Sequence, residues 1–501
     1  MRAPDADVVV VGAGFAGLLV ARELVAAGRS VTVLERGARL NHRQQIENRA
    51  HEVVGPTTRH NDEAAEGTDY PWLYTYGVGG SSLHWTGVAP RLMPSDFELR
   101  SRHGVGRDWP VSYRELEPFF EDAEQTLSVA GGPNPVFGRA YSPPLPPHPL
   151  SPVDEAVALA LEPFYTLPQA RTSRRVGGRA ACCGATTCEL CPVDARFSML
   201  HVLDDGLGSS DRLDLRDLTA VARLRRDRSR IAAVETIDGE GRRSALQAET
   251  VVLAANGLEN PGILLRSGLD GPDVGRWLFD HSHRLLDFQL DRRVPHGHGA
   301  ALITGVSYAY AEGQWRSERG GQLVLPFNPG LSFNHDIAEA IVAGRDGAEL
   351  RDDIRERYSR TLVLDTVGED VPRRERRVEL SPRKDDLGLP LNRVSYPQDT
   401  GYIARGRRAM YEDLERRLRP FGARLVRTRR TGEGAHTLGT CFMGEGSGVV
   451  DRDQRHHEIE NLYVTGGSAF PSYSSHHPTV TICALAIRLG RMLAGRPAPE
   501  R

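Results

Sequence analysis

The sequence predicts an α/β protein that contains a Rossmann-like βαβ unit and a further region built on an antiparallel sheet. The first observation is a β-branched apolar run at residues 8–11 that leads directly into a glycine-rich turn. The second is another strand, turn and helix pattern at residues 250–268. The third is the alternation of apolar and small polar residues over 300–331, which is typical of strands with one solvated face. A chain of 501 residues has room for two or three domains around these elements.

The first element in chain order is a complete βαβ unit. Val8–Val11 is expected to form a strand, and the glycine-rich turn of residues 12–17 follows it directly. From Leu18 to Ala27 the apolar residues recur at helical spacing, and Gly28 ends this helix. Ser30–Leu34 is expected to form the second strand of the unit.

The turn in this unit predicts a dinucleotide-binding site. Gly12 permits the tight turn, Gly14 lets the backbone approach a pyrophosphate, and Gly17 allows the helix to pack closely on the strand. The helix N-terminus supplies N–H donors to the anion. Glu35 lies 23 residues after Gly12, where its carboxylate can accept hydrogen bonds from ribose hydroxyls.

Composition and charge exclude several other classes of protein. The 63 basic and 66 acidic residues give a net charge of −3, so the chain has no overall basic field of the kind that nucleic-acid binding needs. The apolar run Val8–Ala21 has 14 residues, fewer than the roughly 20 of a membrane helix. Asp5 and Asp7 precede it where a signal peptide has basic residues. We therefore expect a cytoplasmic protein with no membrane span and no nucleic-acid partner.

Five segments along the chain resemble the glucose-methanol-choline (GMC) oxidoreductases, and they come in the order seen in that family. The histidine-tryptophan-threonine string at residues 84–86 and the stretch Gly104–Leu127 are most similar to the pyranose oxidases and the bacterial FAD-dependent sugar dehydrogenases. The resemblance implies the GMC fold and FAD as cofactor. The five segments are Gly77–Arg91, Gly257–Gly268, Val274–His281, His436–Gly444 and Asn461–Arg488.

The same motif order implies that two domains are interleaved along the chain. A Rossmann-like FAD-binding domain would take residues 1–100, 180–285 and 432–501. A substrate-binding domain with an antiparallel sheet would take residues 101–179 and 286–431.

Oxidation of an alcohol through a flavin needs a base for the hydroxyl proton, and histidine suits this task because its pKa lies near neutrality. Carried over from the family, His436 takes the position of the base, and His477 takes that of the residue that hydrogen-bonds the same hydroxyl. The carbon-bound hydride would move to flavin N5. His476 is the alternative for the second role, because the histidine doublet allows a slip of one residue.

Further residues are assigned to the flavin by the same resemblance. His84 stands where pyranose oxidases bond the flavin covalently, and the alternative is a histidine that only packs on the ring. Thr86 would donate a hydrogen bond near flavin N5. The remaining cofactor-binding positions implied by the family are Gly79, Gly80 and Ser81 in a turn, Val221 beside the adenine, and Gly467 near the C-terminus.

Four of the six cysteines lie within ten residues, at Cys182, Cys183, Cys188 and Cys191. A disulfide framework spreads its cysteines more widely, so this density favours metal or cofactor chemistry. An iron-sulfur cluster held by Cys183, Cys188 and Cys191 is one interpretation, since bacterial FAD sugar dehydrogenases have a similar pattern whose last gap is one residue longer. Buried free cysteines left from a lost cluster, zinc, and a disulfide are the alternatives.

The function implied is FAD-dependent oxidation of a CH–OH group of a sugar, glycoside or similar polyol to a carbonyl. Oxygen, a quinone or another acceptor would then take the electrons, and an oligomer is compatible with the sequence. Two alternatives are open: a redox-neutral lyase that keeps FAD structurally, and a flavin and electron-transfer subunit of a larger dehydrogenase complex. An NAD-dependent enzyme is poorly supported, because only one dinucleotide fingerprint is present.

Overall fold

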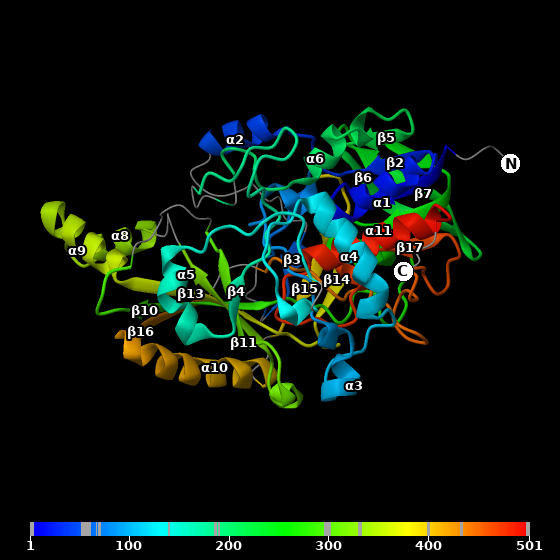
Figure 1. The fold of residues 1–501 in the computed structure, drawn as a ribbon. Coiled ribbons are helices and arrows are strands. Elements are labelled where there is room, and N and C mark those ends of the chain that lie inside the picture. Colours follow the sequence, from blue (N-terminus) through cyan, green and yellow to red (C-terminus); the bar gives the residue numbers. More distant parts are fainter. Residues whose placement is uncertain are drawn as a thin grey trace.

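The computed structural model describes residues 5–51, 62–66, 68, 72–138, 141–184, 188, 191–294, 302–328, 333–397, 401–430 and 434–496. Within these ranges, none of the helices has both the length and the hydropathy to cross a bilayer. Figure 1 shows two main bodies, with the parallel sheet and its helices on one side and the larger antiparallel sheet on the other.

The N-terminal βαβ unit forms as predicted, and it lies at the centre of a five-stranded parallel sheet. In the sheet order β17-β9-β1-β2-β5, neighbouring strands come from distant parts of the chain. The strand in the predicted segment 250–268 is β9, which pairs with β1. The strands are β1 (Ala6–Val11), β2 (Val31–Leu34), β5 (Leu213–Arg216), β9 (Ala248–Leu253) and β17 (Leu462–Val464).

Helix α1 begins earlier than the sequence predicted. It covers Phe15–Ala26 rather than beginning at Leu18, so Gly17 lies inside the helix and not in the turn before it. A glycine occurs at this helical position because of close packing: a Cβ added at Gly17 would lie 1.9 Å from the carbonyl oxygen of Gly12. Glycine is therefore needed inside the first helical turn, where it lets the helix contact the strand end.

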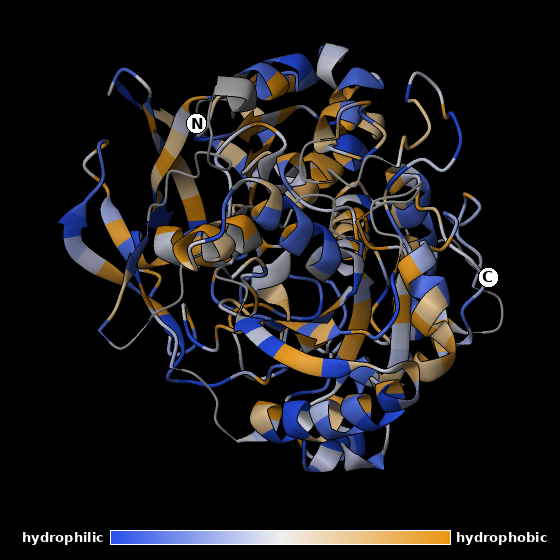
Figure 2. Cartoon of the chain, turned by 90° about the vertical axis from the view of Figure 1, so that its left-hand side faces the viewer, coloured by the Kyte–Doolittle hydropathy of each residue, from blue (hydrophilic) through white to orange (hydrophobic). Residues whose placement is uncertain are grey.

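Helix α11 packs against both α1 and α4, and the three helices lie beside the parallel sheet (Figure 1). Their apolar faces and the buried valines of β1 form the largest core cluster of the protein. Figure 2 shows hydrophobic stretches on strands and helices in the interior of the molecule, while many of the peripheral loops and helix faces are hydrophilic. The helices of this half of the fold are α1, α4 (Tyr113–Leu127), α6 (Met199–Asp204), α7 (Asn256–Arg266) and α11 (Thr479–Leu493).

The second body is a six-stranded antiparallel sheet in the order β16-β10-β13-β12-β11-β4. Helix α10 covers it and contributes Met410 and Leu414 to a separate apolar core. Within the predicted 300–331 region the described residues form two of its strands, β11 and β12. The strands are β4 (Phe164–Thr166), β10 (Ser282–Gln289), β11 (Gly305–Tyr310), β12 (Gln322–Phe327), β13 (Thr361–Gly368) and β16 (Arg424–Arg430).

Two three-stranded sheets flank these bodies, and one of them joins segments that the sequence assigned to different domains. Strand β3 pairs with β15, so residues 62–64 lie beside residues 392–394. Helix α7 packs against β14 and β15 as well as β6. The domain boundaries themselves stay a prediction. The strands are β3 (Asp62–Ala64), β14 (Arg377–Lys384) and β15 (Pro390–Ser395) in one sheet, and β6 (Thr219–Asp227), β7 (Arg230–Asp238) and β8 (Arg243–Leu246) in the other.

The other helices are short or lie at the periphery; α8 and α9 extend away from the sheets in Figure 1. They are α2 (His42–His51), α3 (Leu99–His103), α5 (Pro152–Val157), α8 (Phe333–Val342), α9 (Gly347–Ser359) and α10 (Tyr402–Leu418). Single 3-10 turns are η1 (Gly80–Leu83), η2 (Pro94–Phe97), η3 (Pro135–Phe137), η4 (Ala158–Leu161), η5 (Leu207–Ser209), η6 (Gln314–Ser317), η7 (Arg419–Phe421) and η8 (Gly467–Ala469).

Candidate active site

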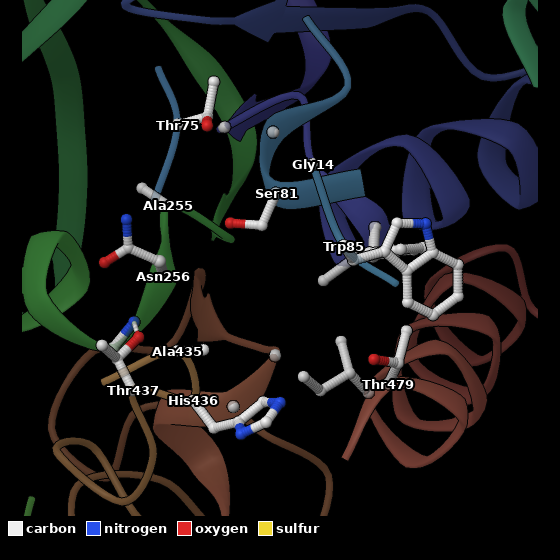
Figure 3. A pocket seen from close by; sticks show the side chains of 18 of the residues that line it. Gly14, Thr75, Ser81, Trp85, Ala255, Asn256, Ala435, His436, Thr437 and Thr479 are labelled. Atoms are coloured by element: carbon white, nitrogen blue, oxygen red, sulfur yellow. Dashed lines mark hydrogen bonds between the residues drawn. The ribbon is translucent and has the colours of Figure 1, made fainter. Parts of the chain in front are cut away.

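A cavity of about 760 Å³ runs from the end of β2 to the C-terminal histidines. Its walls come from the first glycine-rich turn, the segment 73–88, strand β6, the start of α7, the loop 435–438 and the start of α11. Figure 3 shows Ser81 and Asn256 facing the space above Ala435 and His436, with Thr75 toward the opposite end. The cavity is therefore assembled where segments distant in sequence meet at the edge of the parallel sheet.

The glycine-rich turn shapes one wall of this cavity. Gly12 has φ +102°, and a Cβ there would lie 2.6 Å from the carbonyl oxygen of Ala254. A Cβ at Gly14 would meet no protein atom closer than the Cα of Gly80, at 3.9 Å. Gly12 and Gly14 line the cavity, whereas Gly17 packs behind it. Gly14 thus leaves room on the cavity side that a ligand can occupy.

Glu35 closes the β2 end of the cavity with a buried carboxylate. It accepts hydrogen bonds from the backbone N–H groups of Ala13 (3.0 Å), Gly37 (2.8 Å) and Gly77 (3.0 Å). Burial raises the pKa of Glu35 to about 7, against the opposing effect of these backbone hydrogen bonds. A carboxylate has about four lone-pair sites, and these three hydrogen bonds leave room for a further donor. The binding of a ribose hydroxyl by Glu35 is compatible with these contacts and stays a prediction.

The turn around η1 brings a second backbone segment against the first. The backbone N–H of Gly79 donates to the carbonyl of Ala13 (2.8 Å), and a Cβ at Gly80 would lie 3.0 Å from the Cα of Gly14. Gly80 and Ser81 line the cavity, and Gly79 holds the turn from behind. The backbones of the two turns therefore lie so close at Gly14 and Gly80 that a side chain at Gly80 would crowd Gly14.

His84 and Thr86 also line the cavity, as the sequence predicted. The Nδ1 atom of His84 lies 2.6 Å from the hydroxyl of Thr75. The guanidinium of Arg171 donates to the carbonyl of Thr86 (2.8 Å), which fixes the backbone there. A covalent bond between His84 and the cofactor stays a prediction.

Val221 and Gly467 lie in two further walls of the same cavity. Val221 is a buried residue of β6, near the Glu35 end of the site. Gly467 begins η8, where a Cβ would lie 2.5 Å from Leu438. All the predicted cofactor positions except Gly17 and Gly79 therefore reach the cavity surface.

His436 and His477 meet at the far end of the cavity. Their ring centroids are 5.6 Å apart, and the ring planes are nearly perpendicular at 89°. The backbone N–H of His436 donates to Asp280 (3.1 Å), and the Nδ1 atom of the ring lies 3.4 Å from the same carboxylate oxygen. His477 precedes Pro478, which caps the N-terminus of α11. The structure thus places the two predicted catalytic side chains in one wall.

Two further histidines, His281 and His283, surround this pair. Phe279 and Leu438 exchange backbone hydrogen bonds of 3.1 and 3.2 Å in an antiparallel bridge. His281 is two residues after Phe279 and His436 is two residues before Leu438, so the two histidines stand opposite each other, with their rings 4.7 Å apart. His283 lies 6.3 Å from the His436 ring. Sequence reasoning did not assign these two histidines, although their alternate spacing at the start of β10 is a signal that both face one side.

The four rings have different electrostatic surroundings. Burial, reinforced by the neighbouring histidines, lowers the pKa values of His281 and His477 well below the usual range. Burial is the largest influence on His283 and acts to lower its pKa, but the Asp365 and Asp280 carboxylates together outweigh it, so the pKa of His283 is raised. Asp365 lies 3.3 Å from the Nδ1 atom of His283 and lines the cavity beside it.

His476 faces away from this cluster. It is fully buried, its Nδ1 atom lies 3.1 Å from the hydroxyl of Ser474, and its ring packs near Phe137 and Tyr308. The cavity lining includes His477 and not His476. The geometry therefore favours His477 over its neighbour for contact with a ligand.

Comparison with known proteins places the chain in a family. The model of the GMC oxidoreductase family matches residues 165–283 and 372–486, and that of the FAD dependent oxidoreductases matches residues 7–97. The chain is 31% identical to the 6'''-hydroxyparomomycin C oxidase of Streptomyces lividus, over 99% of this chain and 92% of the relative. The chain belongs to the GMC oxidoreductase family.

Other relatives and solved structures agree with this assignment. The fructose dehydrogenase large subunit of Gluconobacter japonicus is 28% identical over 97% of each chain. The paromamine 6'-oxidase of Streptomyces fradiae is 30% identical, over 98% of this chain and 91% of the relative. The crystal structure of pyridoxine 4-oxidase from Mesorbium loti superposes with a TM-score of 0.69 at 21% identity, and covers 98% of this chain and 100% of that one. The predicted fold class, family and FAD-dependent oxidoreductase activity are confirmed.

The cavity of this GMC oxidoreductase fits FAD. Its lining extends from Glu35 to the histidines and includes Gly12, Gly14 and Gly80, which present no side chain to it. The hydroxyl of Thr465 in its wall is buried without a hydrogen-bond partner. Gly12, Gly14 and Gly80 would hold the pyrophosphate and Glu35 the ribose, as the fingerprint predicts. The flavin ring would then lie toward His84 and His436.

The cysteine segment of this GMC oxidoreductase lies behind the cavity wall. Cys188 accepts a hydrogen bond from the backbone N–H of Leu302 (3.4 Å), a residue that lines the cavity, and Cys191 accepts one from Ala195 (3.2 Å). Burial raises the pKa of the Cys188 thiol. Among the described residues, the group spaced to hold a metal consists of three histidines and no cysteines, so the thiols as placed do not fit a cluster. The iron-sulfur cluster stays a prediction, and we derive no electron-transfer step from it.

Proposed function

We propose that this enzyme oxidises a CH–OH group of a sugar, glycoside or similar polyol to a carbonyl, with His436 as the base. The observation that carries the proposal is the pair of His436 and His477 in the wall of a cavity that fits FAD. A histidine at hydrogen-bond distance from a bound hydroxyl can take its proton as the carbon loses hydride. When bound, FAD supplies the acceptor for that hydride at flavin N5.

The protein side chains divide the remaining work. His436 accepts the hydroxyl proton, and His477 donates a hydrogen bond to the same oxygen and orients it. The buried Asp280 carboxylate lies 3.4 Å from the Nδ1 atom of His436, where it stabilises the positive charge that the ring gains. One proton thus goes to His436 and two electrons leave with the hydride, which leaves a carbonyl product.

The substrate class is inferred from the relatives and from the polarity of the histidine end. Three relatives are named for oxidation of fructose, paromamine and a hydroxyparomomycin, all of which are carbohydrates or contain them. His283, Asp365 and Thr437 give this end of the cavity hydrogen-bonding groups that a polyhydroxylated ligand can use. A role as the catalytic subunit of a larger dehydrogenase is a second candidate, supported by the relative named as a large subunit.

Anaerobic flavin reduction tests the proposal. Mixing the purified holoprotein with a panel of sugars and polyols should bleach the flavin absorption with at least one of them. His436→Ala should keep its FAD and slow this bleaching by about 100-fold or more, the usual loss when a general base is removed. His476→Ala is the matched control, because it removes a neighbouring buried histidine outside the cavity.

Two outcomes would contradict the proposal. If His436→Ala bleaches at the parent rate while His476→Ala does not, the base belongs to the doublet and the assignment is wrong. If no alcohol in the panel bleaches the flavin, a redox-neutral role is favoured instead.

A further inference from the structure

The histidine cluster at the end of the cavity has the composition of a transition-metal site. One ring nitrogen each of His281, His283 and His436 lies within 4.8 Å of the other two. His281 is 1% exposed, and the side chains of His283 and His436 are 16% and 17% exposed. Imidazole nitrogen is a preferred ligand of Zn²⁺ and Cu²⁺, and three histidines with an open fourth position are a known zinc arrangement.

The surroundings of the three rings support this chemistry. The Nδ1 atom of His283 lies 3.3 Å from Asp365, that of His436 lies 3.4 Å from Asp280, and that of His281 lies 3.5 Å from the hydroxyl of Tyr473. Metal-binding histidines usually direct one nitrogen at an oxygen in this way and bond the metal through the other. The two carboxylates also offset the charge of a divalent cation.

The fold keeps these ligands together. The antiparallel bridge between Phe279 and Leu438 fixes His281 opposite His436. Asp365 and His283 are diagonal neighbours on β13 and β10, because His283 pairs with Val367 and Leu285 pairs with Asp365. His281 is also stacked on Tyr473, with ring centroids 4.4 Å apart. The site is therefore supported by backbone pairing and packing as well as by the rings themselves.

We propose that His281, His283 and His436 bind a divalent transition-metal ion of the Zn²⁺ type, and that the bound ion inhibits the oxidation. Zinc bonds of about 2.0–2.1 Å at tetrahedral angles need ligand nitrogens about 3.4 Å apart. The set, now within 4.8 Å, must therefore contract modestly around the ion. Inhibition follows because the lone pair that bonds the metal is the one with which His436 would accept a proton; this part rests on the proposed function.

Binding is tested on the FAD-containing protein after removal of metals with a chelator and dialysis. Isothermal titration with Zn²⁺ should show one saturable site per chain, and Co²⁺ in the same site should give visible absorption beyond the flavin bands. His283→Ala should weaken Zn²⁺ binding by at least about 100-fold, and Asp365→Asn by about 10- to 100-fold. His457→Ala is the control, because His457 is an exposed histidine outside the cavity, and it should bind as the parent does.

Each variant is checked for FAD content and thermal unfolding, and His283→Gln serves if His283→Ala fails to fold. Saturable binding lost in the His283 variant and kept in His457→Ala supports the site. No saturable Zn²⁺ binding in the parent, or equal binding in the His283 variant, overturns it. Zn²⁺ should also slow anaerobic flavin reduction in proportion to occupancy. Binding without inhibition would keep the site and overturn the role of His436 as the base, so the two proposals fail separately.

Discussion

The histidine cluster and the cysteine segment are two groups of side chains of the types that ligate metals, and they are assembled in opposite ways. Four cysteines lie within ten residues of sequence, yet as placed in the structure they do not form a ligand group. The histidines lie at positions 281, 283, 436 and 477, and the fold brings their rings within 4.7 to 6.3 Å of one another.

The difference shows what assembles a site in this protein. The histidines converge because an antiparallel bridge, two paired strands and the start of α11 all end at one cavity. The cysteines lie between β4 and α6, and none of the four belongs to a helix or strand among the residues that the structure describes. In this protein, the close spacing of cysteines along the sequence is therefore a weaker predictor of a ligand group than the positions where strand ends and a helix start meet.

The largest effect is expected where two distant glycine turns meet. Gly14→Leu should fold, because the residue has extended backbone (φ −88°, ψ −163°) and a Cβ has space, but its side chain enters the cavity. We expect purified Gly14→Leu to contain almost no FAD, as measured by absorbance. Gly178→Leu, at an exposed glycine with no atom within 4 Å of its Cβ, should keep about one FAD per chain. Full flavin in Gly14→Leu would show that the meeting of these turns does not form the cofactor site.

A smaller effect is expected from Glu35, at the other end of the same cavity. Its pKa is raised by burial to about 7, from 4.5 in an unfolded chain. The protonated form is thus favoured by folding, so this contribution to stability is complete below pH 4.5 and is lost as the pH rises through 7. At about 1.4 kcal/mol per pKa unit, a rise of about 2.5 in pKa corresponds to a loss of roughly 3 to 4 kcal/mol.

Glu35→Gln should remove this pH dependence. The measurement is urea unfolding at pH 5, 6 and 8 in flavin-free protein, for which the Gly14→Leu variant provides the background. The free energy of unfolding of the protein that retains Glu35 should fall relative to that of the Glu35→Gln variant as the pH rises. If the difference in free energy of unfolding between these two proteins stays constant with pH, the three backbone N–H donors offset the effect of burial on the pKa of Glu35.

The smallest effect is expected in the cysteine segment. Cys188→Ser should change the rate of anaerobic flavin reduction by less than about twofold, because Cys188 lies outside the cavity lining and serine can accept the same hydrogen bond from Leu302. Iron analysis of anaerobically purified protein then decides whether the comparison holds. If the parent protein contains three or four irons per chain and the Cys188→Ser variant contains none, the thiols converge around a cluster. That result would contradict the difference between the cysteine segment and the histidine cluster.

Local sequence patterns predicted the parts of the fold that local physics determines. The β-branched run of Val8–Val11, the glycine turn and Glu35 identified the βαβ unit, because each of these signals acts within a few residues. The beginning of α1 was missed, since Gly17 is inside the helix for a packing reason that involves Gly12. The family was assigned from the order of five motifs along the chain, which is more specific than any one of these motifs.

The site was predictable only in part. His436 and His477 came from family motifs, but His281, His283 and Asp365 required knowledge of which strands lie side by side. Glu35 was expected to bind a ribose, and two of the N–H groups that it binds belong to Ala13 and Gly37 of the predicted βαβ unit. The third belongs to Gly77, and no local pattern indicates the approach of that segment. Contacts of this kind are set by tertiary packing.

The strand order of the parallel sheet also has a consequence for biosynthesis. β1 and β2 are complete at residue 34, but β17, which forms the edge of their sheet, ends at residue 464. At a translation rate of about 5–20 residues per second, the ribosome needs roughly 20–90 s to supply that last strand. During this interval the apolar face later covered by α11 has no partner, so we expect the nascent chain to depend on chaperones until its final segment emerges.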